Sequence, residues 1–211
     1  MADSQIQIQE IFYSIQGESV YSGLPCVFVR THGCNLNCLY CDTITVKNPS
    51  VLNLNQILST INQYSHINVV QVTGGEPLIH DEIYELFSLL KENHFTILLE
   101  TNGAIEVNKV PDYVCKIIDV KTPGSGHQDS FLIKNLDFIN PDKDNLKFVL
   151  SDLSDYKWMK NFLAKYGLYG SHVLVSTVFS ALKPLEIVEK ILEDGLNVRF
   201  QLQIHKYIGI Q

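Results

Sequence analysis

Short runs of apolar residues alternate along the chain with longer segments in which apolar positions recur every three or four residues. The short runs are typical of strands buried on both faces, as in a parallel sheet. We expect such strands at residues 26–31, 67–73, 95–101, 114–120, 144–150, 172–178 and 197–204. The amphipathic segments predict helices at residues 53–64, 81–93, 152–166 and 184–194. Either Asn53 or Asn55 is placed to cap the first helix.

This alternation indicates a parallel sheet whose strands are joined by crossover helices. A closed eight-stranded barrel takes about 250 residues, whereas this chain has 211. The pattern therefore predicts an α/β fold with an incomplete, TIM-like barrel, and a doubly wound open sheet is the alternative. Residues 1–211 show no repeat or linker, so we expect a single domain. The weak periodicity of residues 121–143 predicts a long loop with a short helix.

Residues of special chemistry follow the ends of successive predicted strands. His32 to Cys41 follow the first strand, Gly74 to Pro77 the second, Asn102-Gly103 the third and Lys121 to Gly126 the fourth. In parallel α/β folds, ligands bind at the carboxyl ends of the strands. The sequence therefore predicts a ligand site on this one face of the fold.

The composition excludes several classes of protein. With 45% hydrophobic and 10% aromatic residues, the chain is not disordered as a whole. No apolar run approaches the roughly 20 residues of a membrane span, and the start MADSQIQIQE lacks signal-peptide character, so we expect a cytoplasmic protein. The net charge is −7 and the chain has only two arginines, Arg30 and Arg199, without a basic cluster. Nucleic acid is therefore not an expected partner.

Three of the five cysteines fall within eight residues, as Cys34, Cys38 and Cys41 in the spacing C-x3-C-x2-C. In a reducing compartment such clustering indicates metal or redox chemistry rather than disulfides. Three thiolates at this spacing can hold three corners of a 4Fe–4S cluster and leave the fourth iron open.

A zinc site is the alternative interpretation of these cysteines. Structural zinc usually takes four protein ligands. Cys26 and Cys115 lie in predicted strands, where buried packing is the expected role. His32 is a candidate fourth ligand, but it lies only two residues from Cys34. Ligand count and spacing favour the open cluster.

The cysteine motif, together with Gly74-Gly75-Glu76-Pro77 and the aromatic Tyr40 before Cys41, resembles the radical S-adenosylmethionine (SAM) superfamily. The resemblance implies a partial barrel in which the open iron binds SAM and an electron from the cluster cleaves it to a 5′-deoxyadenosyl radical. A glycine pair lets the backbone approach a ligand closely. Glu76 has a structural alternative, in which it fixes the turn by accepting backbone hydrogen bonds.

The N-terminal run EIFYSIQGES and the tail LQIHKY resemble the 7-carboxy-7-deazaguanine synthase branch of that superfamily. The resemblance implies that Arg30 binds a substrate carboxylate, as a guanidinium fork does well; an ion pair with Glu18 or Glu76 is the alternative. It implies that Thr43 binds Mg²⁺, which favours oxygen ligands. The substrate-binding residues that it implies are Ile15, Gln16, Gly17, Glu18, Arg30, Thr73, His205 and the terminal Gln211, with Gln203 as a further neighbour.

The resemblance also implies a set of SAM contacts. These are Tyr40, Gly74, Gly75, Glu76, Thr101, Lys121, Ser125, Gly126, His127, Ser176, Thr177, Val178 and Phe179. No side chain is expected to act as a catalytic group, because SAM and the cluster carry the radical chemistry.

The activity implied is a radical ring contraction of 6-carboxy-5,6,7,8-tetrahydropterin to 7-carboxy-7-deazaguanine with loss of ammonia, in queuosine biosynthesis. A flavodoxin or ferredoxin as electron donor and a homodimeric state are expected from the same resemblance. Two alternatives stay open: an activating enzyme for a glycyl-radical protein, which shares the cysteine spacing, and a zinc-binding module without catalysis.

Overall fold

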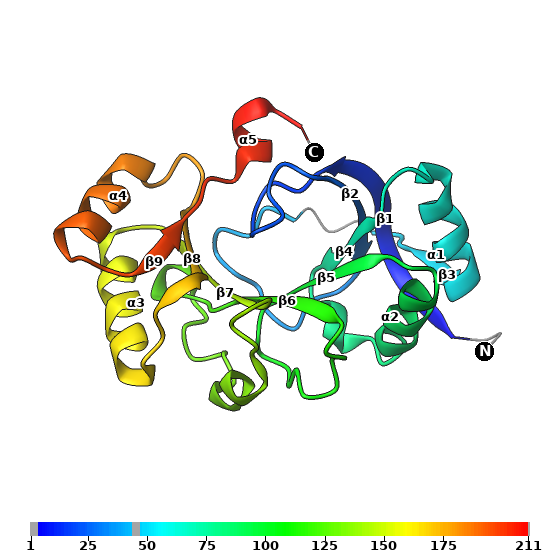
Figure 1. Ribbon diagram of the computed structural model, residues 1–211, viewed down its shortest axis with the longest axis horizontal. Coiled ribbons are helices and arrows are strands. Elements are labelled where there is room, and N and C mark those ends of the chain that lie inside the picture. The colour runs from blue at the N-terminus through cyan, green and yellow to red at the C-terminus, as the bar shows by residue number, and fades with distance from the viewer. Residues whose placement is uncertain (1–3, 44–46, 211) are drawn as a thin grey trace.

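The computed structural model describes residues 4–43 and 47–210. In this part of the chain one sheet contains nine strands in the order β3-β1-β2-β4-β5-β6-β7-β8-β9. Their bounds are β1 Gln5–Ile15, β2 Pro25–Thr31, β3 Ser50–Asn53, β4 Val69–Gly74, β5 Thr96–Thr101, β6 Val114–Asp119, β7 Asn145–Leu150, β8 Gly170–Thr177 and β9 Val198–Phe200. Neighbours from β2 to β9 pair in parallel, while β1 is antiparallel to β2 and β3. The sheet curls into an open arc (Figure 1), so the predicted partial barrel is confirmed.

Four of the helices lie outside this arc (Figure 1); the first leads from β3, at the edge of the sheet, to β4, and the other three connect consecutive parallel strands. They are α1 Leu54–Ile61, α2 Ile83–Glu92, α3 Leu153–Tyr166 and α4 Pro184–Glu193, and a fifth helix, α5 Ile204–Ile208, follows the last strand. Asn53, one of the two expected caps, closes a capping box with Gln56 at the start of α1. None of the helices described is long and apolar enough to cross a membrane.

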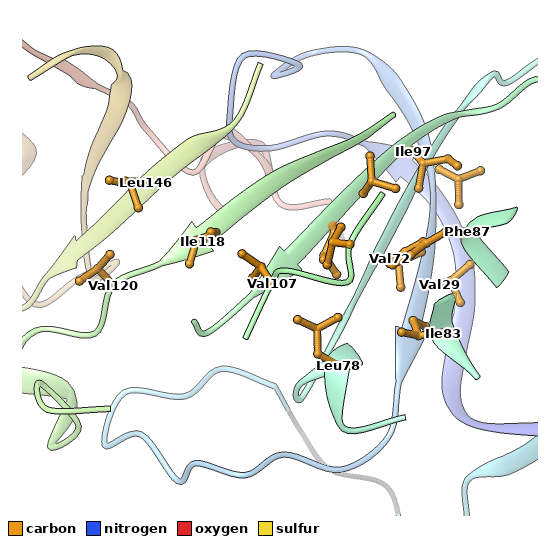
Figure 2. Close-up of a cluster of buried hydrophobic side chains, with 14 of the residues drawn as sticks. Val29, Val72, Leu78, Ile83, Phe87, Ile97, Val107, Ile118, Val120 and Leu146 are labelled. Atoms are coloured by element: carbon orange, nitrogen blue, oxygen red, sulfur yellow. The ribbon is translucent and has the colours of Figure 1, made fainter. Parts of the chain in front are cut away.

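The main hydrophobic core fills the space between the outer face of the sheet and these helices. Because side chains alternate along a strand, every second strand residue points outward into this layer, as Val72 and Ile118 do in Figure 2. Ile83 and Phe87 of α2 reach the same layer and are fully buried. Burying each such side chain stabilises the fold by about 1.5–3 kcal/mol, and this layer holds the strand ends in place.

The inner face of the arc has two levels. The lower level is apolar and contains Leu98, Cys115 and Ile117, with Tyr21 and Val69 packed against them. Cys115 donates its thiol to the Lys143 carbonyl at 2.8 Å, in agreement with a packing role. The upper level, nearer the carboxyl ends of the strands, is polar and charged.

Two parts of the chain differ from the predicted pattern. β1 and β3 were not predicted, although QIQIQEIF in β1 alternates with period two. The strand expected at 197–204 ends at Phe200, because Gln201 makes one last backbone bond, to Val175, and the tail then turns toward the loop at Gly17. Residues 121–143 contain two short 3₁₀ helices, Pro123–Ser125 and Ile133–Phe138, within a loop.

Candidate functional site

A cavity of about 530 Å³ opens at the carboxyl ends of the strands, inside the arc. It collects residues that sequence reasoning assigned to the cluster, the cofactor and the substrate. The predicted residues in its wall are Ile15, Gln16, Gly17, Glu18, Arg30, Cys34, Cys38, Tyr40, Cys41, Thr43, Thr73, Gly74, Gly75, Thr101, Lys121, Val178 and His205. Other predicted residues lie outside the wall: Glu76, Ser125, Gly126, His127, Ser176, Thr177 and Phe179. Gln211 lies outside the described residues.

The cysteine loop follows β2 and forms one end of the cavity. Cys34 and Cys41 are exposed, Cys38 is half-buried, and all three are free thiols. Burial raises the pKa of the Cys38 thiol. The Leu36 amide donates to the Cys34 sulfur at 3.4 Å, which fixes the first turn of the loop. The loop therefore presents three thiols to one space.

The donor set fits an iron–sulfur cluster better than a single metal ion. Within residues 4–43 and 47–210, no three His, Cys, Asp or Glu side chains converge in a geometry that would hold one ion. A zinc ion needs its ligands to converge on one point. In a 4Fe–4S cluster each thiolate binds its own iron, so the three sulfurs stand further apart. Three free thiols on one loop that lines the cavity supply the three protein ligands that such a cluster takes.

The glycine pair after β4 is required by the protein's own backbone. A Cβ on Gly74, whose φ is +146°, would lie 2.3 Å from the Thr31 carbonyl oxygen. A Cβ on Gly75 would lie 2.0 Å from the Gly33 carbonyl oxygen. The two glycines therefore allow the end of β4 to pack directly on β2 and on the start of the cysteine loop, and they also line the cavity.

Glu76 is fully buried behind the cavity wall. Its carboxylate accepts hydrogen bonds from the Thr101 hydroxyl at 2.8 Å, the Asn102 amide at 2.7 Å and the Leu78 amide at 3.1 Å. Burial raises its pKa. These bonds tie the end of β4 to the end of β5, as the structural alternative for Glu76 describes.

The segment 121–127 packs against the cysteine loop and is hydrogen-bonded to it. The Ser125 hydroxyl donates to the Thr122 carbonyl at 2.7 Å and accepts from the His127 amide at 3.0 Å. The Ser125 carbonyl in turn accepts from the Leu39 amide at 3.0 Å. The His127 ring contacts the Asn37 side chain at 2.8 Å. This segment thus holds the middle of the cysteine loop against the end of β6.

A charged network in the cavity wall is built around Lys147, a residue that the sequence does not predict for the site. Lys147 of β7 forms ion pairs with Glu100 and with Glu18, the latter at 3.2 Å, and Asp119 lies 3.8 Å away. Burial lowers the pKa of Lys147, but Glu100 and Glu18 outweigh it and hold that pKa well above its usual value. Burial likewise raises the pKa of Glu100, and Lys147 outweighs it and brings it below its usual range. The cavity wall therefore has an acidic region around Lys147, Glu100 and Glu18, which we call the acidic pole and in which Lys147 and Glu100 are ionised.

Glu100 also accepts from two neutral side chains of β4. Gln71 donates to it at 3.0 Å and Thr73 at 3.1 Å. Gln71 in turn accepts a hydrogen bond from Gln16 of the N-terminal motif. Lys147 and Gln71 share one sequence feature with Arg30: each is a polar residue inside an apolar predicted strand. Such residues are rarely buried without a partner, so this feature could have pointed to both.

Buried polar atoms without partners point toward a ligand. Among the described residues, Asp119 Oδ1 and Gln203 Oε1 line this cavity and have no hydrogen-bond partner. Asp119 Oδ2 is held by Lys121 at 2.8 Å. Because an unpartnered buried acceptor is costly, these two oxygens are placed to accept bonds from a bound molecule.

Arg30 forms an ion pair, with a partner that the sequence reasoning did not name. Its Nε lies 2.8 Å from Glu10 Oε1 on β1, so the ion pair is with Glu10 and not with Glu18 or Glu76. The guanidinium stands 5.5 Å from the centre of the Phe12 ring, which stacks on Phe28. Arg30 is therefore fixed in orientation at the wall of the cavity.

The segment 15–18 and the C-terminal tail close the other side of the cavity. Gln203 donates to Glu18 at 2.7 Å, and the His205 ring lies so close over Gly17 that a Cβ there would be 1.8 Å from the ring nitrogen. Burial lowers the pKa of His205. The two motifs at opposite ends of the chain thus form one wall.

Comparison with known proteins agrees with this geometry. Residues 28–128 match the model of the radical SAM superfamily. The chain is 39% identical to the 7-carboxy-7-deazaguanine synthase of Chlorobaculum tepidum over 98% of this chain and 95% of that protein. It is 38% identical to that of Koribacter versatilis over 96% of both. QueE from Escherichia coli, at 22% identity, shares the fold with a TM-score of 0.74 over 94% of this chain and 95% of that one.

Proposed function

Because the chain belongs to the 7-carboxy-7-deazaguanine synthase family of radical SAM enzymes, we propose that it forms 7-carboxy-7-deazaguanine from 6-carboxy-5,6,7,8-tetrahydropterin. The reaction contracts the reduced ring and releases ammonia, as a step of queuosine and deazapurine biosynthesis. The observation that carries this proposal is a cavity lined both by three free thiols and by the ion-paired network around Lys147.

Cys34, Cys38 and Cys41 are the residues that would hold a 4Fe–4S cluster. Such a cluster would supply the electron that cleaves bound SAM to methionine and a 5′-deoxyadenosyl radical; this radical would take a hydrogen atom from C6 of the pterin and return one after ammonia has left, since the overall conversion is redox-neutral. The chain's own share is to bind, to orient and to exclude water. Gly74 and Gly75 bring backbone to the cavity beside the cysteine loop, which supports a role for them in SAM binding.

The acidic pole suits the pterin edge, which carries adjacent N–H donors. Glu18 and Glu100 both form ion pairs with Lys147, and carboxylates in their charged form make the stronger hydrogen bonds. Arg30, held by Glu10 and Phe12, suits the carboxylate of the same substrate. The acidic pole and Arg30 together would set the orientation of the pterin relative to the cluster.

Further parts of this proposal concern partners of the reaction. Thr43 lines the cavity two residues after Cys41, which supports a Mg²⁺ ion at its hydroxyl, since Mg²⁺ prefers oxygen ligands. A flavodoxin or ferredoxin would deliver the electron, and two copies of the chain would form the working unit.

The experiment that tests the roles in this proposal compares two arginine variants after anaerobic reconstitution. Arg30→Ala should abolish pterin turnover and leave uncoupled SAM cleavage. Arg199→Ala is the matched control, because Arg199 is exposed on the edge strand β9 and lies outside the cavity wall. Full pterin turnover in Arg30→Ala would refute the carboxylate role.

A further inference from the structure

The C-terminal tail is bound to two separate parts of the cavity wall. At one end the Ile204 amide donates to the Gly17 carbonyl at 3.0 Å, and the Ser19 amide donates to the Gln201 side chain at 2.8 Å. At the other end Lys206 forms an ion pair with Asp42. The tail therefore spans from the segment that follows β1 to the residue that follows Cys41. Figure 1 shows α5 beyond the ends of the strands, beside the blue connection from β1 to β2.

The position of the tail depends on these contacts because β9, the last strand of the sheet, ends at Phe200. Its last backbone bond to a strand is from the Gln201 amide to the Val175 carbonyl, at 2.9 Å. α5 has five residues and no buried side chain. So short a helix is marginal in isolation, which leaves its position to the contacts at Gly17 and Asp42 and to the Tyr207 ring, 5.3 Å from Phe179.

We propose that the Lys206–Asp42 ion pair is a latch that couples closure of the tail over the substrate to the position of the cysteine loop. Lys206 and Asp42 are positioning residues in this account. The inference rests on the proposed function, since it takes the segment at Glu18 and the tail to be the substrate side of the cavity. A substrate that binds both the segment at Glu18 and the tail would keep Lys206 in contact with Asp42. Asp42 would in turn fix the positions of its neighbours Cys41 and Thr43.

If the ion pair is such a latch, removing it should uncouple SAM cleavage from pterin turnover. An exposed ion pair changes an open-to-closed equilibrium by up to about five-fold. Lys206→Met should therefore raise the amount of 5′-deoxyadenosine released per molecule of pterin product by up to about five-fold. The KM for the pterin should rise by a similar factor, while kcat falls less.

A second readout does not depend on the cluster. In the full chain without cofactors, Lys206→Met should speed hydrogen exchange in peptides covering residues 16–19 and 201–208, again by up to about five-fold. Lys190→Met is the matched control, because it removes a lysine from an exposed ion pair with Glu193 on α4, and Lys190 is not part of the cavity wall. This control should leave exchange and product ratio unchanged.

The pair itself is tested by a double-mutant cycle. Asp42→Asn and Lys206→Met should each raise exchange in the tail, and the double variant should be no worse than either single one. Additive effects, or tail exchange in Lys206→Met equal to that of the unsubstituted protein, would overturn the latch. Failure of the unsubstituted protein to form any deazaguanine would instead refute the proposed function, and the exchange data would still decide on the latch.

Discussion

Two buried lysines on neighbouring strands face opposite sides of the sheet. Lys116 of β6 pairs with Asp144 at 2.9 Å and lines a smaller hollow with Val110 and Phe138. Lys147 of β7 faces the main cavity and pairs with Glu100 and Glu18. Both lysines are buried, but the Lys116 pair stabilises the fold, whereas the Lys147 pairs make the wall of the site polar.

Lys147→Met should abolish pterin turnover, because it leaves the half-buried Glu100 in the cavity wall without its counter-ion. Breaking a buried ion pair by removing one partner costs about 3–5 kcal/mol. Lys116→Met is the control, since it should cost a similar amount of unfolding free energy while the folded fraction keeps its ratio of product to SAM consumed. Chemical denaturation and product analysis measure the two effects. Equal loss of product ratio in both variants would contradict this account.

Gly17→Ala should displace His205, because the new Cβ would lie 1.8 Å from the ring nitrogen. The expected result is a higher KM for the pterin. In the background of His205→Ala the same glycine change should add little, since the clash is gone. Steady-state kinetics of the four proteins test this coupling, and an undiminished glycine effect without the His205 ring would disprove it.

At the scale of elements, the seven parallel strands and four of the helices could be predicted, because buried runs and amphipathic segments have distinct periods. β1 is not among the predicted strands, because the end of it, EIFYSI, belongs to the motif that resembles a substrate-binding segment, although QIQIQEIF alternates as an antiparallel strand does. α5 could not be predicted, because the alternation in NVRFQLQI suits a strand, and it is long-range contacts, among them those to Gly17 and Glu18, that draw the tail away from the sheet.

The joint between β4 and β5 depends on one carboxylate. Glu76→Gln should destabilise the protein by about 1–3 kcal/mol, because an amide has one acceptor oxygen and would turn its NH₂ toward one of three donors. Glu92→Gln, at the exposed end of α2, should be nearly neutral. Urea unfolding followed by circular dichroism compares the two, and a neutral Glu76→Gln would argue against the structural role.

At the scale of the whole molecule, the cavity could be predicted only in part. The convergence of motifs at strand ends follows from parallel topology, so the place of the site was readable from sequence. The pairing of Lys147 with Glu18 joins residues far apart in the chain, and no local pattern reports such a contact. The ion pair of Arg30 was likewise foreseen in kind, but Glu10 belongs to the strand that was overlooked.

Acid stability of the molecule should depend on Asp144, which is fully buried and accepts from the Lys116 amide at 2.8 Å and the Asn140 amide at 3.0 Å. Burial raises its pKa, but these bonds and the two lysines outweigh it and hold the pKa below its usual range. Because the folded pKa lies below the unfolded one, the stabilisation is present above about pH 4 and is lost as the pH falls through the folded pKa.

Asp144→Asn should therefore lower the unfolding free energy most at neutral pH, by about 3–5 kcal/mol, and progressively less below about pH 4. Asp142→Asn, on the same turn but exposed, should show no such trend. Denaturation series at several pH values measure both. A deficit for Asp144→Asn that stays constant with pH would contradict the assignment.

The central claim is that this chain converts a carboxylated tetrahydropterin by a radical reaction. Its most direct test is anaerobic reconstitution with iron and sulfide, followed by mass analysis after incubation with SAM, Mg²⁺, a reductant and the pterin carrying deuterium at C6. We predict 7-carboxy-7-deazaguanine and ammonia, with deuterium from C6 recovered in the 5′-deoxyadenosyl group, as SAM or as 5′-deoxyadenosine. An intact cluster that cleaves SAM but yields no deazaguanine, and no deuterium in SAM or in 5′-deoxyadenosine, would contradict the account.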